Sequence, residues 1–208
     1  MSSSSAFPRK RGRPREFDID AATASLERAL WSRGYRSTNV EELAADAGLS
    51  LSSLYGAFGS KQGVLDAALA RYETQMSGII GDLESAARGL PDIERFVRQV
   101  RAVLDDPDSP RGCFMVNTMV EVGDGIPEVQ ERVTAYRRRI EQALRAALDT
   151  AETVGDIEAG SSHDRARLVQ AALFGAFAAS RAGDTMAARN GLQSISRELR
   201  RWRSAVRR

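Results

Sequence analysis

The stretch from Asp18 to Tyr72 constrains the fold of this chain more than any other feature of the sequence. Its apolar residues recur every three to four positions, which is the period of helices buried along one face. Side chains that favour N-caps precede these stripes, and glycines stand where helices end or turn tightly. These caps and turns are Asp18, Gly34, Gly48, Ser50 and Ser60. The order predicts three short helices, of which the last two form a helix-turn-helix, followed by a long fourth helix.

A capping box is expected at the start of the second helix. Thr38 and Glu41 have the Thr-x-x-Glu spacing in which each side chain hydrogen-bonds to the backbone N–H of the other residue. Gly48 then supplies the turn before the third helix, whose apolar residues include Leu54 and Phe58.

The remainder of the chain predicts further helices and no strands. Segments with helical apolar spacing alternate with short stretches rich in Pro, Gly, Asp and Ser. The predicted helices cover about 92–105, 113–123, 127–153, 163–183 and 187–205. We therefore expect an all-α protein with three parts. These are a disordered basic arm over 1–16, a three-helix domain with the helix-turn-helix over 17–62, and a larger helical domain over 63–208.

Composition excludes several classes of function. Cys113 is the one cysteine and His163 the one histidine, so an intramolecular disulfide is excluded and no metal site is expected. The chain has no phosphate-binding glycine loop, dinucleotide fingerprint or nucleophile elbow, so we expect no enzyme, no catalytic residues and no cofactor. The longest apolar run, near residues 171–179, is shorter than the ~20 residues that cross a bilayer. Because the N-terminus also lacks a secretory signal, we expect a cytoplasmic protein without a membrane partner.

Only the local concentration of basic residues, and not the net charge, indicates binding to nucleic acid. The net charge of +2 is too small to identify a DNA-binding protein, but the first fifteen residues hold five basic side chains and no acid. Arg11-Gly12-Arg13-Pro14 matches the core of an AT-hook, whose arginines enter a narrow A·T minor groove. We expect Arg11 and Arg13 to contact DNA in this way, and a solubilising tail is the alternative.

The helix-turn-helix is expected to make the major-groove contacts. A recognition helix brings its N-terminal residues to base edges, while flanking residues meet phosphates. Base-edge contacts are expected from Leu51, Ser52, Ser53, Gly56 and Ala57, and the capping residue Ser50 is also expected to contact DNA. Phosphate contacts are expected from Thr38, Tyr55 and Lys61. Hydroxyls and a leucine discriminate few bases strongly, and the best partner for leucine is a thymine methyl group. An ordinary three-helix core is the structural alternative.

The same region resembles the TetR family of bacterial transcriptional regulators. The resemblance is carried by Gly34-Tyr35-x-x-Thr38, Val40-x-x-Leu43-Ala44-x-x-Ala47-Gly48-Leu49-Ser50 and Leu54-Tyr55-x-x-Phe58-x-x-Lys61. It covers residues 17–72 in motif detail, and the remainder agrees in length and helical character. The recognition helix departs from the commoner pattern, which has a basic residue near position 51 and larger side chains at 56 and 57. The resemblance implies a sequence-specific regulator, most often a repressor, which a small-molecule effector releases from a double-stranded DNA operator.

The resemblance also implies a homodimer, for which a palindromic operator is the matching partner. Two stripes in the last helices are candidates for the interface. The stripe in the final helix is Leu192, Ile195, Leu199, Trp202 and Val206. The stripe in the preceding helix is Leu168, Ala171, Ala172, Gly175, Ala178, Ala179 and Ala182. Packing of both stripes within one chain is the alternative.

An effector pocket is implied among the helices between residues 76 and 180. Its expected lining residues are Phe96, Val100, Leu104, Phe114, Val120, Tyr136, Phe174 and Phe177, with Asn117 as a polar contact. Ordinary core packing of these side chains is the alternative.

Cys113 offers a different way to regulate the protein. It opens a predicted helix beside Arg111, and both features would lower the pKa of a thiol and favour a reactive thiolate. The segment from Arg111 to Asn117 also resembles a subgroup of the family that includes sensors of reactive electrophiles. A regulator controlled by electrophile or oxidant modification of Cys113 is therefore one alternative function, and a buried inert cysteine is the structural one. A second alternative function is an architectural DNA-binding protein that uses the basic arm without sequence preference.

Overall fold

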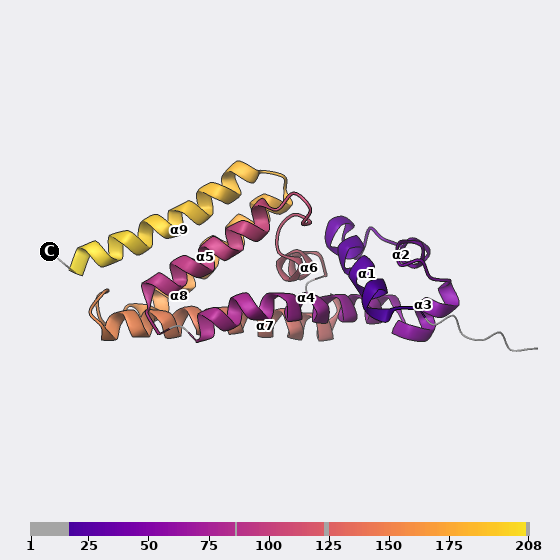
Figure 1. Ribbon diagram of the computed structural model, residues 1–208, viewed down its shortest axis with the longest axis horizontal. Coiled ribbons are helices and arrows are strands. Elements are labelled where there is room, and N and C mark those ends of the chain that lie inside the picture. The colour runs from indigo at the N-terminus through magenta and orange to yellow at the C-terminus, as the bar shows by residue number, and fades with distance from the viewer. Residues whose placement is uncertain (1–16, 86, 123–124, 207–208) are drawn as a thin grey trace, which may run out of the picture.

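The computed structural model describes residues 17–85, 87–122 and 125–206, and all regular structure in these ranges is helical (Figure 1). The helices are α1 (Ile19–Arg33), α2 (Val40–Asp46), α3 (Leu51–Phe58), α4 (Lys61–Glu84), α5 (Leu90–Asp105), α6 (Phe114–Val122), α7 (Pro127–Thr153), α8 (Ser162–Arg181) and α9 (Thr185–Val206). The all-α prediction is confirmed. From α5 onward, each predicted helix limit lies within two residues of the observed one.

Local caps set the limits of the first helices as the sequence predicts. Asp18, Ser50 and Ser60 cap α1, α3 and α4, and each accepts hydrogen bonds from backbone N–H groups two or three residues further along. Gly34 ends α1 with a φ of 96°, and Gly48 makes the turn between α2 and α3 with a φ of 65°. Both conformations are costly for residues with a Cβ atom.

The predicted capping box of α2 is wrong by one residue. Asn39 is the N-cap: its side chain accepts from the backbone N–H of Glu42, and the Glu42 carboxylate accepts from the backbone N–H of Asn39. Thr38 is 1% exposed, and its hydroxyl donates to the Gly34 carbonyl at 2.7 Å instead. Thr38 therefore closes the loop between α1 and α2, whereas the neighbouring pair caps the helix.

A leucine-rich core holds the N-terminal helices together. Its fully buried members are Leu26 and Leu30 of α1, Leu43 of α2, Leu54 of α3, and Leu65 and Leu69 of α4. Truncating a buried leucine to alanine typically costs about 2–5 kcal/mol, so these side chains contribute strongly to holding α3 against α2 and α4.

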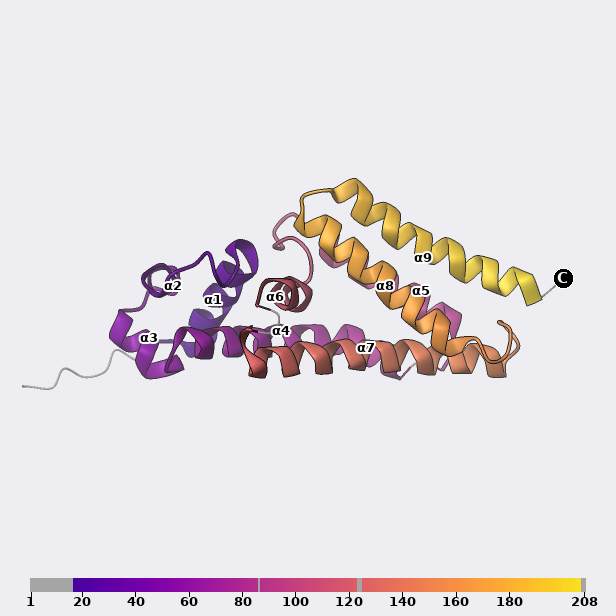
Figure 2. The ribbon, with the colours of Figure 1, turned by 180° about the vertical axis from the view of Figure 1, so that it is seen from behind.

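Helix α4 joins this domain to the rest of the molecule. Helix α4 packs on α1 and α3, and it runs beside α7 along the base of the molecule (Figures 1 and 2). Arg132 of α7 bridges Asp66 and Glu73 of α4, and Arg139 of α7 pairs with Glu84. Because α4 begins at Lys61, the predicted domain boundary at residues 62 and 63 falls inside one continuous helix.

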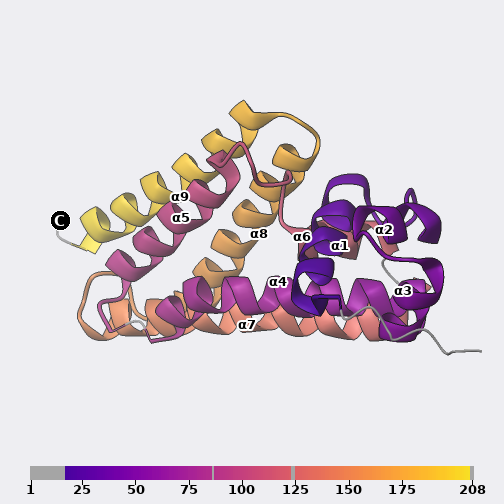
Figure 3. The same cartoon turned by 45° about the vertical axis from the view of Figure 1, so that its right-hand side comes forward.

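Helices α5, α8 and α9 form the upper part of the larger domain, and α9 packs on both α5 and α8 (Figure 3). Leu192, Ile195 and Leu199 of α9 are buried in this packing. The prediction that the α9 stripe faces a partner chain is therefore wrong for these three residues. The stripe of α8 behaves differently, because Leu168 is 56% exposed and Ala171, Gly175, Ala178 and Ala182 are also exposed.

Some predictions fall outside the described residues. The basic arm over 1–16, with Arg11 and Arg13, is one of them. Among the described helices, none combines the length and apolarity required to span a membrane. The described residues also contain no cluster of His, Cys, Asp and Glu side chains that could hold a metal ion.

Candidate nucleic-acid interface and internal cavity

Helix α3 presents a short exposed face at the end of the molecule farthest from α9 (Figure 1). Leu54 anchors the helix in the core, while Leu51 and Tyr55 remain 39% and 46% exposed. Ser52, Gly56 and Ala57 are exposed on the same helix. This face combines one apolar side chain, a phenol and small residues, so the backbone of α3 can approach another surface closely.

The serine hydroxyls at the start of α3 are already hydrogen-bonded to one another. The Ser50 oxygen accepts from the backbone N–H of Ser53 at 3.1 Å and lies 3.0 and 2.9 Å from the hydroxyl oxygens of Ser52 and Ser53. Ser50 is thus the centre of the cap. Ser52, whose side chain is exposed, keeps hydrogen-bonding capacity that can face outward.

Of the three predicted phosphate-contacting residues, Tyr55 is exposed, Lys61 is half-buried and Thr38 is buried. The Lys61 ammonium lies 4.4 Å from the centroid of the Tyr35 ring, which holds this cation beside α3. The Thr38 side chain, by contrast, is buried, and its hydroxyl donates to the Gly34 carbonyl inside the protein. Sequence reasoning did not anticipate the stacking partner Tyr35, although it stands in the Gly34-Tyr35 motif.

A carboxylate of the larger domain holds the loop between α1 and α2. Glu121 of α6 accepts from the backbone N–H groups of Tyr35 at 3.0 Å and Arg36 at 2.7 Å. A Cβ atom at Gly34 would lie 2.8 Å from both Glu121 carboxylate oxygens, so only glycine leaves room for this contact. No sequence pattern predicts this role, because a glutamate near a helix end ordinarily faces solvent.

A second set of contacts ties α1 to the larger domain. The Arg181 guanidinium of α8 donates to the carbonyls of Trp31 and Ser32 at 2.8 and 2.9 Å, at the C-terminus of α1. The Trp31 indole N–H donates to the Arg111 carbonyl at 3.2 Å. Helix α1 is therefore fastened to both α8 and the loop before α6.

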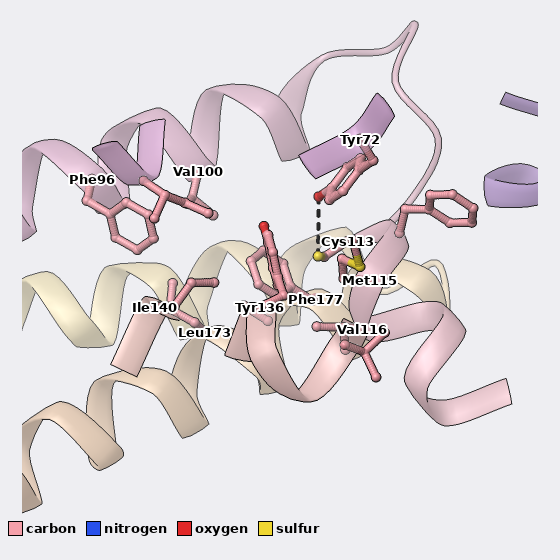
Figure 4. Close-up of a cluster of buried hydrophobic side chains, with 14 of the residues drawn as sticks. Tyr72, Phe96, Val100, Cys113, Met115, Val116, Tyr136, Ile140, Leu173 and Phe177 are labelled. Carbon is pink, nitrogen blue, oxygen red and sulfur yellow. Dashed lines mark hydrogen bonds between the residues drawn. The ribbon is translucent and has the colours of Figure 1, made fainter. Parts of the chain in front are cut away.

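A cavity lies among α4, α5, α7 and α8 (Figure 4). Six of the predicted pocket residues line it, namely Phe96, Val100, Leu104, Tyr136, Phe174 and Phe177. Sequence reasoning missed further lining residues, which are Tyr72, Met76, Ile79, Ile80, Val103, Gly112, Ile140 and Leu173. Cys113 also lines the cavity. Apart from Gly112, which lies in the loop before α6, the missed residues belong to apolar helix faces. Such faces predict a core without showing where its packing is incomplete.

The other predicted pocket residues lie elsewhere. Phe114 is buried but stacks near Trp31, with ring centroids 6.1 Å apart, and does not line the cavity. The Asn117 side chain donates to the Arg111 carbonyl at 2.9 Å, and this hydrogen bond closes the loop before α6. Val120 is 75% exposed. The predicted helix over this segment is therefore present as α6, but its packing directs Phe114, Asn117 and Val120 away from the cavity.

The polar atoms of the cavity gather at one end. The Tyr72 hydroxyl donates to the Cys113 sulfur at 3.2 Å, and the Tyr136 hydroxyl points into the same region (Figure 4). Burial raises the pKa of both tyrosines well above the usual value, so both hydroxyls are protonated.

The prediction that Cys113 has a lowered pKa is wrong. Burial raises the pKa of the thiol, and the hydrogen bond from Tyr72 and the nearby backbone N–H groups only partly offset this effect. Cys113 is therefore a protonated, buried thiol, since desolvation outweighs the favourable field at the start of α6.

The comparisons with known proteins agree with this architecture. Residues 20–68 match the family described as "Bacterial regulatory proteins, tetR family", and residues 89–195 match "Tetracyclin repressor-like, C-terminal domain". The chain is 25% identical to the HTH-type transcriptional repressor ComR of Escherichia coli (strain K12) over 160 residues, which are 74% of this chain and 75% of ComR.

Solved structures show the same fold. A cysteine mutant of the TetR family transcriptional regulator CifR, complexed with 26bp double-strand operator DNA, is 28% identical with a TM-score of 0.77. The match covers 92% of this chain and 100% of that chain. A TetR transcriptional regulator from Chloroflexus aurantiacus shares the fold at 22% identity, with a TM-score of 0.74 over 85% of this chain and 90% of its own.

The capped helices α2 and α3, the glycine turn between them and the exposed face of α3 define a helix-turn-helix DNA-binding protein. Both of its domains match the same family of regulators. The chain belongs to the TetR family. It is a transcriptional regulator that binds double-stranded DNA, and it is not an enzyme.

Proposed function

We propose that this regulator is a homodimeric repressor, acting in the cytoplasm, that leaves its operator when a small molecule occupies the internal cavity. The position of Tyr72 carries the proposal. Its hydroxyl borders the cavity, and its ring packs edge-on against Trp31 of α1, with ring centroids 5.1 Å apart. One side chain of α4 thus touches both the cavity and the DNA-binding domain.

Helix α3 enters the major groove of the operator in this proposal. It contains no Arg, Lys, Asn, Gln, Asp or Glu, so it lacks the side chains that read a base pair with two hydrogen bonds. Leu51 reads thymine methyl groups, Ser52 supplies a hydroxyl, and Gly56 and Ala57 permit a close approach. Tyr55 and Lys61 neutralise or hydrogen-bond to phosphates at the groove edge.

Affinity beyond what α3 supplies comes from the basic arm. Arg11 and Arg13 enter the minor groove beside the half-site, where a narrow A·T-rich groove concentrates negative potential. The arm adds affinity without choosing the site, which remains the role of α3.

The second copy of the chain packs on the exposed stripe of α8. Small side chains at Ala171, Gly175, Ala178 and Ala182 allow close approach of a partner helix, and Leu168 supplies apolar area at one end. A two-fold dimer places two copies of α3 on a palindromic operator, with half-sites about one helical turn, ~34–36 Å, apart.

Effector control follows from the contacts between the two domains. Glu121 and Arg181 hold the loop after α1 and the end of α1, while Tyr72 connects α1 to the cavity. A ligand that favours a different position of α4 changes the separation of the two recognition helices. Coupling of this kind typically amounts to about 1–3 kcal/mol, or 5–150-fold in DNA affinity.

Modification of Cys113 is the second candidate mode of control. The observation in its favour is that the thiol lines the cavity, where an electrophile could enter. Burial and the raised pKa oppose it, because the thiolate is the reactive form. Mass spectrometry after mild treatment of the folded protein with N-ethylmaleimide tests this mode, and an unmodified Cys113 excludes it.

A reporter assay tests repression. The chain is expressed together with a reporter gene under the promoter region of its own gene, and repression is expected. Lys61→Ala and Leu51→Ala should restore reporter expression, whereas Arg138→Ala, an exposed cation on α7, should not. Activation of the reporter by the chain would contradict the repressor proposal, and equal repression by all variants would contradict the assigned DNA contacts.

A further inference from the structure

We infer that the cavity takes a small, uncharged, largely apolar molecule with one hydrogen-bond acceptor, such as a ketone, which the Tyr72, Tyr136 and Cys113 end of the cavity recognises. The inference rests on the proposed effector-released function and names the chemical class of that effector. It follows from the charge, the polar atoms and the free space of the cavity.

The walls of the cavity contain no charged side chain. The nearby cations Arg132 and Arg139 lie on α7 and already pair with Glu73 and Glu84 of α4. An ionised ligand would therefore be buried without a partner, which costs several kcal/mol even after relaxation of the protein. The cavity consequently favours neutral molecules over the corresponding carboxylates or amines.

The polar end of the cavity favours an acceptor on the ligand. The Tyr72 hydroxyl donates to the Cys113 sulfur, which is a weak acceptor, at 3.2 Å. A carbonyl oxygen is a better acceptor, so a ligand that supplies one draws the hydroxyl of Tyr72 away from Cys113. The Tyr136 hydroxyl faces the same space and can donate to the same oxygen (Figure 4).

The free space of the cavity limits the size of the ligand. About 30 Å³ is open to the centre of a water-sized sphere, which is enough for one or two water molecules. A cavity that holds benzene measures about 150 Å³, so even one ring requires the wall to move. The wall can yield at its half-buried residues, which are Met76, Ile79, Val103, Leu104 and Phe174. Binding is therefore linked to a change in wall position, as a regulatory ligand requires.

Trp31 makes this binding observable. It packs against Tyr72, so a ligand that moves the Tyr72 ring changes the surroundings of the indole. Trp202 is the other tryptophan of the chain, and it lies at the far end of α9 beside Arg165. Trp202→Phe therefore leaves Trp31 as the single fluorescent reporter beside the cavity.

The experiment uses matched pairs of neutral and anionic probes with the full-length Trp202→Phe chain. Acetophenone is compared with benzoate, and 2-octanone with octanoate; ethylbenzene serves as a ring without an acceptor. Trp31 emission gives the binding curve, and fluorescence anisotropy of a labelled operator gives release. Each ketone is expected to bind at least tenfold more tightly than its carboxylate, and acetophenone several-fold more tightly than ethylbenzene.

Two variants separate recognition from folding. Tyr72→Phe keeps the ring but removes the hydroxyl, so the preference for acetophenone over ethylbenzene should shrink toward equality. Val100→Phe places a ring in the space that the probes would occupy and should abolish the response of Trp31 to every probe. Circular dichroism checks that both variants are folded.

Several outcomes overturn the inference. They are carboxylates that bind as tightly as the ketones, ketones that leave Trp31 emission unchanged, or a Val100→Phe chain that responds like the parent. Each of these results leaves operator binding intact and so leaves the DNA-binding function standing. Ketone binding that does not release the operator contradicts the proposed release alone, and loss of specific DNA binding on every fragment contradicts the proposed repressor.

Discussion

Replacing Glu121 by alanine should weaken the junction between the two domains. The carboxylate accepts from two backbone N–H groups, those of Tyr35 and Arg36, at 3.0 and 2.7 Å. Hydrogen bonds to a charged group contribute about 1.5–3 kcal/mol each, and solvent screening of the half-buried Glu121 reduces this to about 1–2 kcal/mol each. Loss of both predicts a decrease of about 2–4 kcal/mol in the free energy of unfolding.

The decrease is measured by urea unfolding, followed by circular dichroism at fixed protein concentration. For a chain of this length, about 2–4 °C per kcal/mol corresponds to a fall of about 4–16 °C in the melting temperature. Glu131→Ala, an exposed glutamate on α7, is the matched control and should change stability by less than about 0.5 kcal/mol. Equal stability of Glu121→Ala and the control would refute the role given to this contact.

Three further perturbations test other parts of the account. Lys61→Ala should lower operator affinity across sequences and reduce the slope of log affinity against log salt by about 1 per protomer, measured by anisotropy titrations between 50 and 200 mM salt. Leu168→Arg should place a charge in the proposed dimer interface, and analytical ultracentrifugation should detect a folded monomer; an unchanged dimer would remove α8 from the interface. Burial opposes ionisation of Asp92, but hydrogen bonds from the Arg88 backbone and guanidinium more than offset it, so the pKa of Asp92 is lowered. Its stabilising effect is therefore present above the unfolded pKa of about 3.9 and is lost as the pH falls through the folded-state pKa. Asp92→Asn should destabilise the protein at pH 7 and lose less stability on acidification than the parent, and identical acid-unfolding curves would contradict this.

The helix limits were predictable because they depend on local chemistry. Asp18, Ser50 and Ser60 cap helices through neighbouring backbone groups, and no distant contact is needed to place them. The capping box of α2 was misplaced because Thr38-x-x-Glu41 and Asn39-x-x-Glu42 both fit the pattern. Burial of Thr38 decides between them, and burial is a tertiary property.

The packing partners of the helices were less predictable than their limits. The 3-4-3-4 spacing of Leu192, Ile195 and Leu199 shows which face of α9 is apolar but not what covers it, and α5 and α8 of the same chain cover it. Glu121 has no pattern in the sequence, since its role depends on α6 meeting the loop before α2.

The candidate cavity was predictable only in part, for the same reason. Helical period places Phe96, Val100 and Phe177 on inward faces, and the structure shows them at the cavity. Tyr72 belongs to an equally apolar face of α4, and only the meeting of α4 with α7 and the loop before α6 brings its hydroxyl to Cys113. Phe114 shows the converse, because a buried aromatic side chain can pack away from the cavity.

The most direct test of the account is fluorescence anisotropy with labelled duplexes from the DNA that flanks the gene of this protein. The titrations are performed at low and physiological salt with excess unrelated DNA. One fragment is expected to remain bound about 10³-fold or more tightly than bulk DNA. Binding that the competitor removes equally from every fragment would contradict sequence-specific regulation at this gene and favour an architectural role for the basic arm.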